Sequence, residues 1–422
     1  MSVRPYKLGL LGCGTVGQGL VELVTRNRAL IRERAGIDLS FTQILVRDRG
    51  KKRPGVDHEL LTTSPEKVIN NGCDMVVELV GGLEPARTFI QNALSNRKHV
   101  VTANKALLAA DGLALLRAAA VQRVQFGFEA SVCGGIPIVR ALQGGLVGNH
   151  IESISGILNG TCNNILTRMS DARVSFEEAL KEAQAKGFAE ADPTLDIDGY
   201  DAAQKLKILS ELAFGGTLPL DSVQVEGIRN ITADDVEAAR KWGYVIKLLA
   251  AAQSDGHAVS LRVRPVLLPR NHQLASVRDE NNAVLVKGDA VGEMLFHGKG
   301  AGSLPSASAV LSDIVEIASR RRAFPRISGR VLQTSNRNAE CQHYLRFPVE
   351  EPSAIGSISA TLERYGVGVA RAAASWAKDP SANHQVTVLT HSSTECALQH
   401  ALWCISESGV VKENVTSLNI AA

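Results

Sequence analysis

A glycine pattern near the start of the chain constrains the fold more than any other feature. An apolar run over residues 7–11 leads directly into GCGTVG at residues 12–17, and a helical pattern follows. In such a Gly-x-Gly-x-x-Gly motif, the first glycine permits a sharp turn, the second lets the backbone approach a pyrophosphate, and the third lets the helix pack on the strand. The free N–H groups at the helix start attract anionic phosphates. The motif therefore predicts a dinucleotide site, rather than a glycine turn without a ligand, formed by Gly12, Gly14, Thr15, Val16 and Gly17.

Strand and helix patterns alternate through residues 1–145. Apolar strands over 39–46, 74–80 and 99–104 each end in a polar or glycine-rich loop before a helix. Buried apolar strands that alternate with helices indicate an α/β unit with a parallel, doubly wound sheet. Ligands bind such sheets at the carboxyl ends of the strands, where Arg47, Gly81 and Lys105 fall.

The residue after the second strand bears on which dinucleotide binds. An acidic residue there would hold the ribose of NAD, whereas an arginine pairs with the 2′-phosphate of NADP. Arg47 occupies this position, and Asp48 stands beside it. We expect NADP, with NAD as the alternative. The alternative to any cofactor role is that Arg47 is simply a solvated loop residue.

Composition and charge exclude several classes of protein. A length of 422 residues predicts two or three domains. The net charge of +3 is too small to indicate a nucleic acid or an anionic membrane as partner. No secretory signal or bilayer-length apolar run is visible, and the seven cysteines are scattered without C-x-x-C spacing. We therefore expect a cytoplasmic protein without a disulfide framework or a structural zinc.

The rest of the chain predicts two further units. Residues 146–330 contain strands and helices of a second α+β unit, and the polar segment 331–342 predicts a linker. Residues 343–422 follow a β-α-β-β-α-β order, which is typical of a ferredoxin-like fold. This last unit carries no cluster of catalytic side chains, so we expect a regulatory or assembly role.

A helix expected over 200–214 carries a charged pair on its apolar face. Asp201 and Lys205 are spaced i,i+4 and fall inside an apolar arc. The opposite arc is polar and holds Gln204, Lys207, Ser210 and Glu211. Unpaired charge on a buried face is costly, so a functional pair is favoured over a structural salt bridge. Such a lysine can protonate an oxyanion formed by hydride addition, and we expect partial burial to lower its pKa.

An acidic loop precedes this helix. Residues 190–198 hold several carboxylates, which could cap the helix or bind a divalent metal, although they lack the spacing of a calcium loop. Beside a buried lysine they would suit a substrate with an ammonium group. Gly160 and Thr161 begin a predicted helix and can offer N–H groups to a carboxylate. The combination predicts a zwitterionic amino acid with a redox-active carbon at its far end.

Segments along essentially the whole chain resemble homoserine dehydrogenases. They are GCGTVG (12–17), TANK (102–105), EASVCGGIP (129–137), GILNGT (156–161), the stretch 190–205 with EADP and GYDAAQK, and GAG (300–302). The resemblance implies NAD(P)-dependent interconversion of L-aspartate 4-semialdehyde and L-homoserine, on the route to threonine and methionine. It also implies a Rossmann-type domain, a catalytic and oligomerisation domain, and a C-terminal ACT regulatory domain in a homodimer or homotetramer.

The resemblance also implies a role for each matching position. Lys205 would be the proton donor, held by Asp201, and Lys105 would contact both the cofactor and the reacting oxygen. The substrate-binding residues would be Glu190 and Asp196 for the amino group, and Gly160 and Thr161 for the carboxylate. Gly302 would touch the nicotinamide half, where a helix over 306–330 returns to the first domain. A sodium-like cation would bind mainly to backbone carbonyls of Glu129, Val132, Gly134 and Ile136.

The chain departs from the family pattern at two places. Phe188 stands where many members have tyrosine, and the turn that begins the ACT domain reads EEPS (350–353) instead of Asp-x-Pro-Gly. Threonine as an effector of this domain therefore stays open. Two other functions also stay open: another two-domain semialdehyde or alcohol dehydrogenase, and an amino-acid sensor with a vestigial cofactor site.

Overall fold

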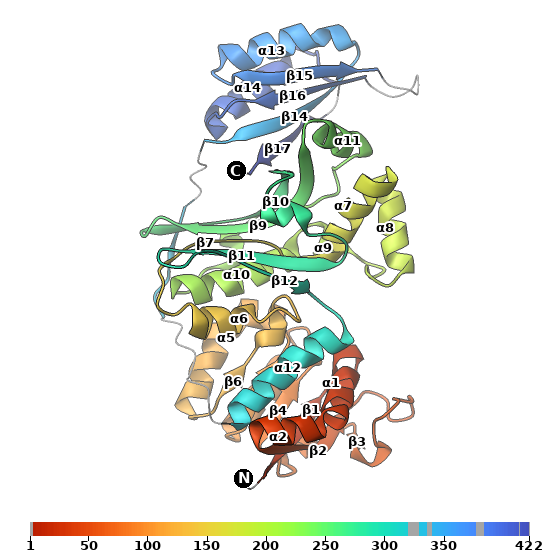
Figure 1. Ribbon diagram of the computed structural model, residues 1–422, viewed down its shortest axis with the longest axis vertical. Helices are drawn as coiled ribbons and strands as arrows, with labels where there is room; N and C mark the ends of the chain where they lie inside the picture. The colour runs from red at the N-terminus through yellow and green to blue at the C-terminus, as the bar shows by residue number, and fades with distance from the viewer. Residues whose placement is uncertain (1–2, 320–328, 336–339, 377–383, 413, 422) are drawn as a thin grey trace.

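Three units are stacked along the long axis of the molecule (Figure 1). The computed structural model describes residues 3–319, 329–335, 340–376, 384–412 and 414–421. The N-terminal unit contains a parallel sheet, the middle unit a large mixed sheet, and the C-terminal unit a smaller antiparallel sheet that continues the middle one. Among the described helices, none combines the length and the apolar character needed to cross a membrane.

The N-terminal unit is a six-stranded parallel sheet in the order β3-β2-β1-β4-β5-β6. This order confirms the doubly wound sheet expected from the alternating pattern. Its strands are β1 (Arg4–Leu11), β2 (Ile37–Leu45), β3 (Leu61–Thr62), β4 (Met75–Glu78), β5 (His99–Thr102) and β6 (Phe126–Gly127). Its helices are α1 (Thr15–Arg26), α2 (Arg28–Ala35), α3 (Pro65–Asn70), α4 (Ala86–Ser95) and α5 (Lys105–Val121). Helices cover both faces of the sheet, and the buried residues of β1 and β4 are apolar except Glu78.

One helix from late in the chain completes this unit. Helix α12 (Ser303–Ala318) packs beside α1, and the Ser303 hydroxyl donates to the Thr15 carbonyl at 2.8 Å (Figure 1). A methyl group on Gly19 of α1 would lie 2.5 Å from Ser303 Oγ, so the two helices are in close contact. The helix expected over 306–330 thus begins at Ser303 and ends at Ala318, while residues 320–328 lie outside the described part of the chain.

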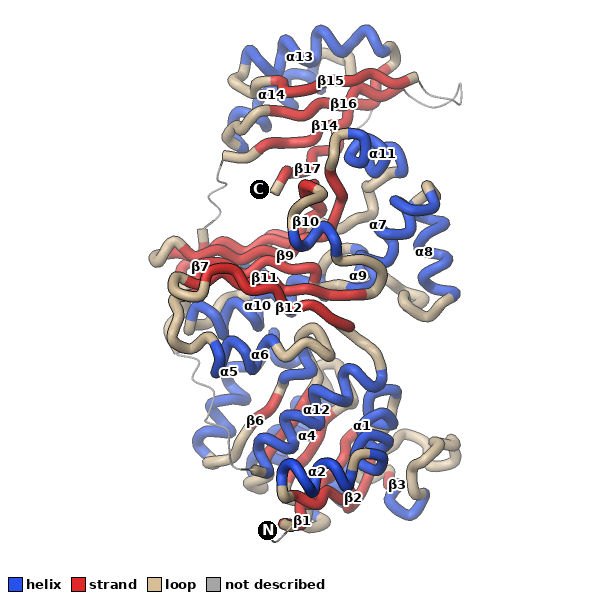
Figure 2. Tube along the Cα trace, in the orientation of Figure 1, coloured by secondary structure: helices blue, strands red, loops and turns tan. Residues whose placement is uncertain are grey.

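The middle unit contains a mixed sheet with strand order β12-β11-β7-β9-β10. Its strands are β7 (Ile151–Ile157), β8 (Gln224–Val225), β9 (Tyr244–Ser254), β10 (Ala258–Pro269), β11 (Asn281–Gly288) and β12 (Gly292–Lys299). Its helices are α6 (Ile138–Arg140), α7 (Gly160–Ala172), α8 (Phe176–Ala185), α9 (Thr194–Ile197), α10 (Tyr200–Phe214) and α11 (Ala233–Lys241). Helix α10 lies between this sheet and the N-terminal unit (Figure 2), so both of its faces are covered.

The C-terminal unit follows a β-α-β-β-α-β order. It comprises β14 (Gln342–Val349), α13 (Ile355–Arg364), β15 (Val369–Ser375), β16 (His384–Thr390), α14 (Glu395–Glu407) and β17 (Thr416–Ile420). Its sheet order is β17-β14-β16-β15, and apolar residues of both helices pack on one face (Figure 2). Strand β17 also pairs in parallel with β10, so the middle and C-terminal sheets are continuous.

The described start of the segment expected to be a linker pairs with strands and turns of the middle unit. Val331 forms a β-bridge with Thr217, and β13 (Gln333–Thr334) pairs with β10. Further along, Tyr344 Oη and Arg346 Nε donate to the buried Asp235 of α11 at 2.8 and 2.7 Å. Backbone pairing and a buried ion pair therefore join the C-terminal unit to the middle one.

Candidate active site

The glycine loop has the geometry that a dinucleotide needs. Gly12 has φ +98°, and a methyl group there would lie 2.8 Å from the Leu79 carbonyl. A methyl group on Gly17 would lie 2.4 Å from the Gly12 oxygen, whereas one on Gly14 would meet nothing within 4 Å. Gly14 is the N-cap of α1 and no side chain caps the helix there. Open space over Gly14 and free N–H groups at the start of α1 suit a pyrophosphate.

A second arginine lies beside this loop. Arg47 is exposed after β2, as the sequence implies, but it forms no hydrogen bond in the described structure. Arg53, which sequence reasoning missed, donates from Nε to the Cys13 carbonyl at 3.3 Å and from Nη1 to Asp48 and Lys51 carbonyls. The basic composition of residues 47–53 was the available signal for it.

A buried glutamate shapes the glycine loop after β4. Glu78 is fully buried and accepts from the Val80 and Gly81 N–H groups at 2.7 and 2.9 Å, and from the Thr102 hydroxyl at 2.6 Å. Asn104, the N-cap of α5, donates to the Gly82 carbonyl at 2.6 Å. Neither role was predicted from the sequence; the available signal for Glu78 was a lone carboxylate inside an apolar strand that is followed by two glycines.

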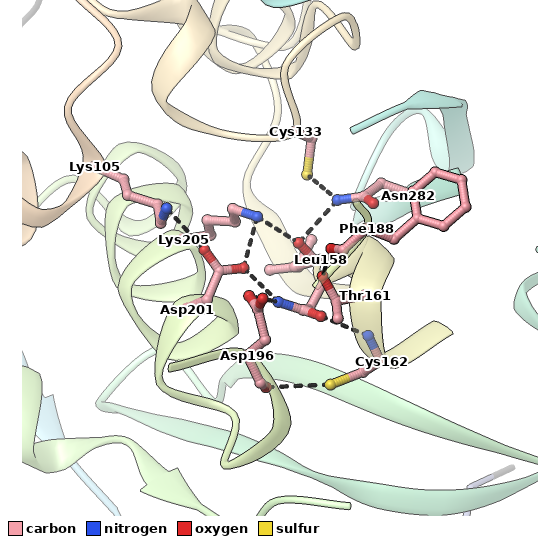
Figure 3. Close-up of polar contacts among 11 residues, drawn as sticks. Lys105, Cys133, Leu158, Thr161, Cys162, Phe188, Asp196, Asp201, Lys205 and Asn282 are labelled. Atoms are coloured by element: carbon pink, nitrogen blue, oxygen red, sulfur yellow. Dashed lines mark hydrogen bonds and ion pairs between the residues drawn. The ribbon is translucent and has the colours of Figure 1, made fainter. Parts of the chain in front are cut away.

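Two lysines share one carboxylate at the junction of the first two units. Asp201 Oδ2 accepts from Lys205 Nζ at 2.8 Å, and Asp201 Oδ1 pairs with Lys105 Nζ at 3.0 Å (Figure 3). Lys205 Nζ also donates to the Leu158 carbonyl at 2.7 Å. An ammonium group has three N–H donors, so these two bonds leave one N–H of Lys205 for a further acceptor.

The electrostatics of this pair differ from the sequence expectation. Burial is the largest single influence and lowers the pKa of Lys205, but the charge and hydrogen bond of Asp201, together with the charges of Cys133 and Asp196, outweigh it, and the pKa ends above its ordinary value. The expectation of a lowered pKa was wrong because it counted burial without the partner. Burial likewise raises the pKa of Asp201, but Lys205 and Lys105 outweigh it and lower that pKa. The pair is therefore an ammonium and a carboxylate at neutral pH.

Asn159 links this pair to the acidic loop. Its Nδ2 donates to Asp201 Oδ2 at 2.8 Å and to Asp196 Oδ1 at 2.7 Å, while its Oδ1 caps α7 through the Cys162 N–H. Burial, together with the charge of Asp201, raises the pKa of Asp196. The buried Cys162 thiol donates to the Asp196 carbonyl at 3.1 Å. Asp196 is thus held close to Asp201 by groups on α7.

The other carboxylates of the acidic loop have different partners and positions. Glu190 is exposed and lines the site, Asp192 caps the Thr194 N–H, and Asp198 pairs with Arg229. A cavity of about 350 Å³ lies between the first two units. Its lining includes Gly81, Gly82, Asn104, Lys105, Glu190, Asp192, Asp196, Asp201 and Gln204. A larger groove, of about 1330 Å³, lies elsewhere, between the middle and C-terminal units.

The start of α7 lies on the same side of Asn159. Gly160 and Thr161 are the first two residues of α7, and both are half-buried. The Thr161 hydroxyl donates to the Phe188 carbonyl at 2.9 Å, so this proton is already used in a hydrogen bond within the protein (Figure 3). The Phe188 side chain is 39% exposed. Gly160 and Thr161 are thus brought near Asp196 and Asp201, as their proposed roles require.

The loop proposed for a cation folds tightly behind the site. Cys133 and Gly134 have φ of +53° and +41°, and a methyl group on Gly134 would lie 2.6 Å from the Gly300 oxygen. Both carboxylate oxygens of Glu129 accept backbone N–H groups, of Val139 and Arg140. Burial and the charge of Asp313 raise the pKa of Glu129 to about 7. The Glu129 carboxylate therefore caps α6, and its carbonyl accepts the Val132 N–H at 3.4 Å.

Gly302 lies where the chain returns to the first unit. It has φ +121° and is the N-cap of α12, immediately before Ser303, which bonds the Thr15 carbonyl. Val132 and Ile136 are buried in the loop that faces this return. Gly302 is thus next to the glycine loop of α1, although the two are far apart in sequence.

Comparisons with known proteins agree with this geometry. Family descriptions match over two segments: "Homoserine dehydrogenase, NAD binding domain" over residues 12–129 and "Homoserine dehydrogenase" over residues 137–315. The chain is similar to homoserine dehydrogenase of Bacillus subtilis, with 38% identity over 97% of both chains. It also resembles the crystal structure of a homoserine dehydrogenase from Thiobacillus denitrificans, with a TM-score of 0.91 and 39% identity over 100% of this chain and 99% of that one.

A hyperthermophilic archaeal homoserine dehydrogenase, solved in complex with NADPH, is more distant. Its TM-score is 0.65 and its identity 26%, over 77% of this chain and 100% of that one. The sequence left three functions open: homoserine dehydrogenase, another two-domain dehydrogenase, and an amino-acid sensor. These matches support homoserine dehydrogenase. The chain belongs to the homoserine dehydrogenase family, whose activity is the nicotinamide-dependent interconversion of L-aspartate 4-semialdehyde and L-homoserine in amino-acid biosynthesis.

Proposed function

We propose that Lys205 transfers the proton in this reaction. The observation that carries the proposal is a buried ammonium with two fixed acceptors, Asp201 and Leu158, and one remaining N–H; Asp201 itself lines the cavity. In reduction, Lys205 donates this proton to the oxygen of the semialdehyde. In oxidation, the neutral amine accepts the proton of the homoserine hydroxyl. Lys105, at the edge of the same cavity, stabilises negative charge on that oxygen.

The same cavity supports a binding mode for the amino acid. Glu190 and Asp196 line it and would bind the substrate ammonium group. The N–H groups of Gly160 and Thr161, at the start of α7, would bind its carboxylate. These contacts would orient the reacting carbon toward Lys205, and fixed orientation contributes a large part of enzymatic rate.

We propose NADP as the preferred cofactor. When bound, its nicotinamide supplies or accepts the hydride. The residues present fit a dinucleotide, because Gly14 leaves open space and Gly12 and Gly17 have no room for a side chain. Thr15 and Val16 begin α1 beneath the pyrophosphate site, Gly302 adjoins it, and Arg47 with Arg53 would pair with a 2′-phosphate. The related archaeal structure with NADPH supports this choice.

A monovalent cation, such as sodium, fits the backbone of the loop behind the site. The donors would be the carbonyls of Glu129, Val132, Gly134 and Ile136. The consecutive left-handed residues Cys133 and Gly134 support this proposal, because they turn the backbone of this short loop sharply. The ion would stiffen the connection between the first two units.

We assign residues 1–145, with α12, to nucleotide binding and 146–330 to catalysis and oligomerisation, with 331–342 as the connection. Residues 343–422 would form an ACT regulatory domain, supported by the strand order β17-β14-β16-β15. Threonine is the candidate effector, and the assembly would be a homodimer or homotetramer. Seven cysteines without a disulfide support a cytoplasmic location.

The test is a spectrophotometric assay with L-homoserine, run with NADP and with NAD, in the presence and absence of threonine. Lys205→Ala should lower kcat by roughly 10²–10⁴-fold while the Kd for NADP holds. Wild-type turnover in a folded Lys205→Ala protein would refute the proton-transfer role.

A further inference from the structure

The carbonyl that holds Lys205 is itself held by a second side chain. Asn282, the second residue of β11, is buried and donates from Nδ2 to the Leu158 carbonyl at 2.8 Å. The same carbonyl accepts from Lys205 Nζ at 2.7 Å (Figure 3). Leu158 lies just after β7, outside the regular pairing of that strand. Its peptide orientation therefore depends on Asn282 as well as on Lys205.

The Asn282 amide has almost no freedom to move. A methyl group on Gly300 would lie 2.1 Å from its Cγ, and one on Gly160 would lie 3.3 Å from its Oδ1. Its Nδ2 also lies 3.6 Å from Cys133 Sγ. Cys133 and Gly300 belong to the two stretches of chain that join the first and middle units. The amide is thus fixed against both connections and against the start of α7.

Packing alone does not explain an asparagine at this position. Among the described residues, Asn282 Oδ1 is a buried atom without a hydrogen-bond partner. A buried polar atom without a partner is unfavourable, and an apolar side chain of similar volume would avoid that cost. What an apolar side chain cannot supply is the N–H donor to Leu158.

We propose that Asn282 is a positioning residue that orients Lys205 for proton transfer by fixing the Leu158 carbonyl. The inference rests on the proposed role of Lys205. Without the amide donor, the Leu158 peptide can rotate, and the spare N–H of Lys205 loses its direction toward the substrate oxygen. A misplacement of about 1 Å in such a group can cost about 10²-fold in rate.

The test compares Asn282→Leu and Asn282→Asp, which keep the branched shape of the side chain; leucine and an ionised aspartate both lack the N–H donor. Both should lower kcat for homoserine oxidation at least tenfold, with KM for homoserine and Kd for NADP within threefold of wild type. The charges of Asp201, Cys133 and Asp196 act on Lys205, and Lys105 shares Asp201 with it. A further carboxylate at position 282 should raise the pKa of Lys205 and so move the rise of kcat to higher pH. Asn282→Leu adds no charge, so the rise of kcat should not move to higher pH in this variant.

A double-variant cycle separates positioning from a structural effect. Asn282→Leu should cost no further turnover in a Lys205→Ala background, because the group that it positions is gone. Thr167→Val is a matched control: it removes the hydrogen bond from the Asp279 N–H in the loop before β11, without a contact to Leu158 or Lys205. It should lower the melting temperature and leave kcat unchanged.

Three results would overturn the inference. They are wild-type kcat in a folded Asn282→Leu protein, an equal loss in the Lys205→Ala background, or a loss of kcat in Thr167→Val that matches it. Should Asn282→Leu not fold, Gly300→Ala displaces the intact amide and must reproduce the fall in kcat. If Lys205→Ala keeps its turnover, the proposed function fails; if it is inactive while Asn282→Leu is fully active, only the present inference fails.

Discussion

Replacing Asp201 with asparagine removes the charge that keeps Lys205 protonated. In the native protein the pKa of Lys205 is raised, because Asp201, with Cys133 and Asp196, outweighs burial. In the proposed mechanism, oxidation of homoserine needs the neutral amine, so its rate should rise with pH through this raised pKa. In Asp201→Asn, burial is opposed much less, so the pKa of Lys205 should fall and the rise in rate should move to lower pH.

The structure sets the size of this shift. Charges 2.8 Å apart interact by about 6 kcal/mol at an effective dielectric constant of about 20. One pKa unit corresponds to about 1.4 kcal/mol, so the upper limit is about four units. Water that enters the site and the remaining charge of Asp196 reduce it, and we expect at least two units.

The assay is kcat/KM for L-homoserine with NADP across the alkaline range, followed by the absorbance of the reduced nicotinamide. Glu211→Gln is the matched control. It breaks another buried i,i+4 pair on the same helix, where Lys207 Nζ donates to Glu211 at 2.6 Å, away from the cavity. Glu211→Gln should lower stability and leave the pH profile in place. An unshifted profile in Asp201→Asn would refute the control of Lys205 by Asp201.

Four other variants test the cofactor and substrate contacts. Gly17→Ala should destabilise the protein by about 1–3 kcal/mol, because its methyl group would overlap the Gly12 oxygen; Gly14→Ala should keep the melting temperature and weaken NADP binding in a titration. Arg47→Ala should raise the Kd for NADP about tenfold and leave that for NAD unchanged, and equal effects on both would remove the argument for a 2′-phosphate. Phe188→Tyr should lower KM for homoserine about threefold to tenfold at constant kcat if its hydroxyl reaches the substrate, and an unchanged KM would place that hydroxyl elsewhere.

Local patterns carried most of what could be predicted. The glycine motif depends on contacts within a few residues, and the observed turn at Gly12 and helix start at Thr15 follow from it. The Asp201–Lys205 pair is one helical turn apart, so spacing alone brought its members together. Helix α10 also runs over the expected residues, from Tyr200 to Phe214.

Features that depend on distant segments were not predictable. Lys207, Ser210 and Glu211 on the polar arc of α10 are buried, because this helix lies between the N-terminal unit and the middle sheet, and Lys207 pairs there with Glu211. Asn159 joins Asp196 to Asp201 only through the fold, and no spacing rule connects these three residues. The pairing of β17 with β10 likewise joins segments about 150 residues apart.

The sharing of Asp201 between two lysines has a mechanical consequence. Lys105 lies in the N-terminal unit and Lys205 in the middle unit, so the number of cations that Asp201 neutralises depends on how close these two units are. With Lys105 near, as in this structure, the carboxylate is divided between two ammonium groups, which makes Lys205 a stronger acid than it would be with Asp201 as its sole partner. If Lys205 is the proton donor, as proposed, a movement that separated the two units would therefore make it a weaker one.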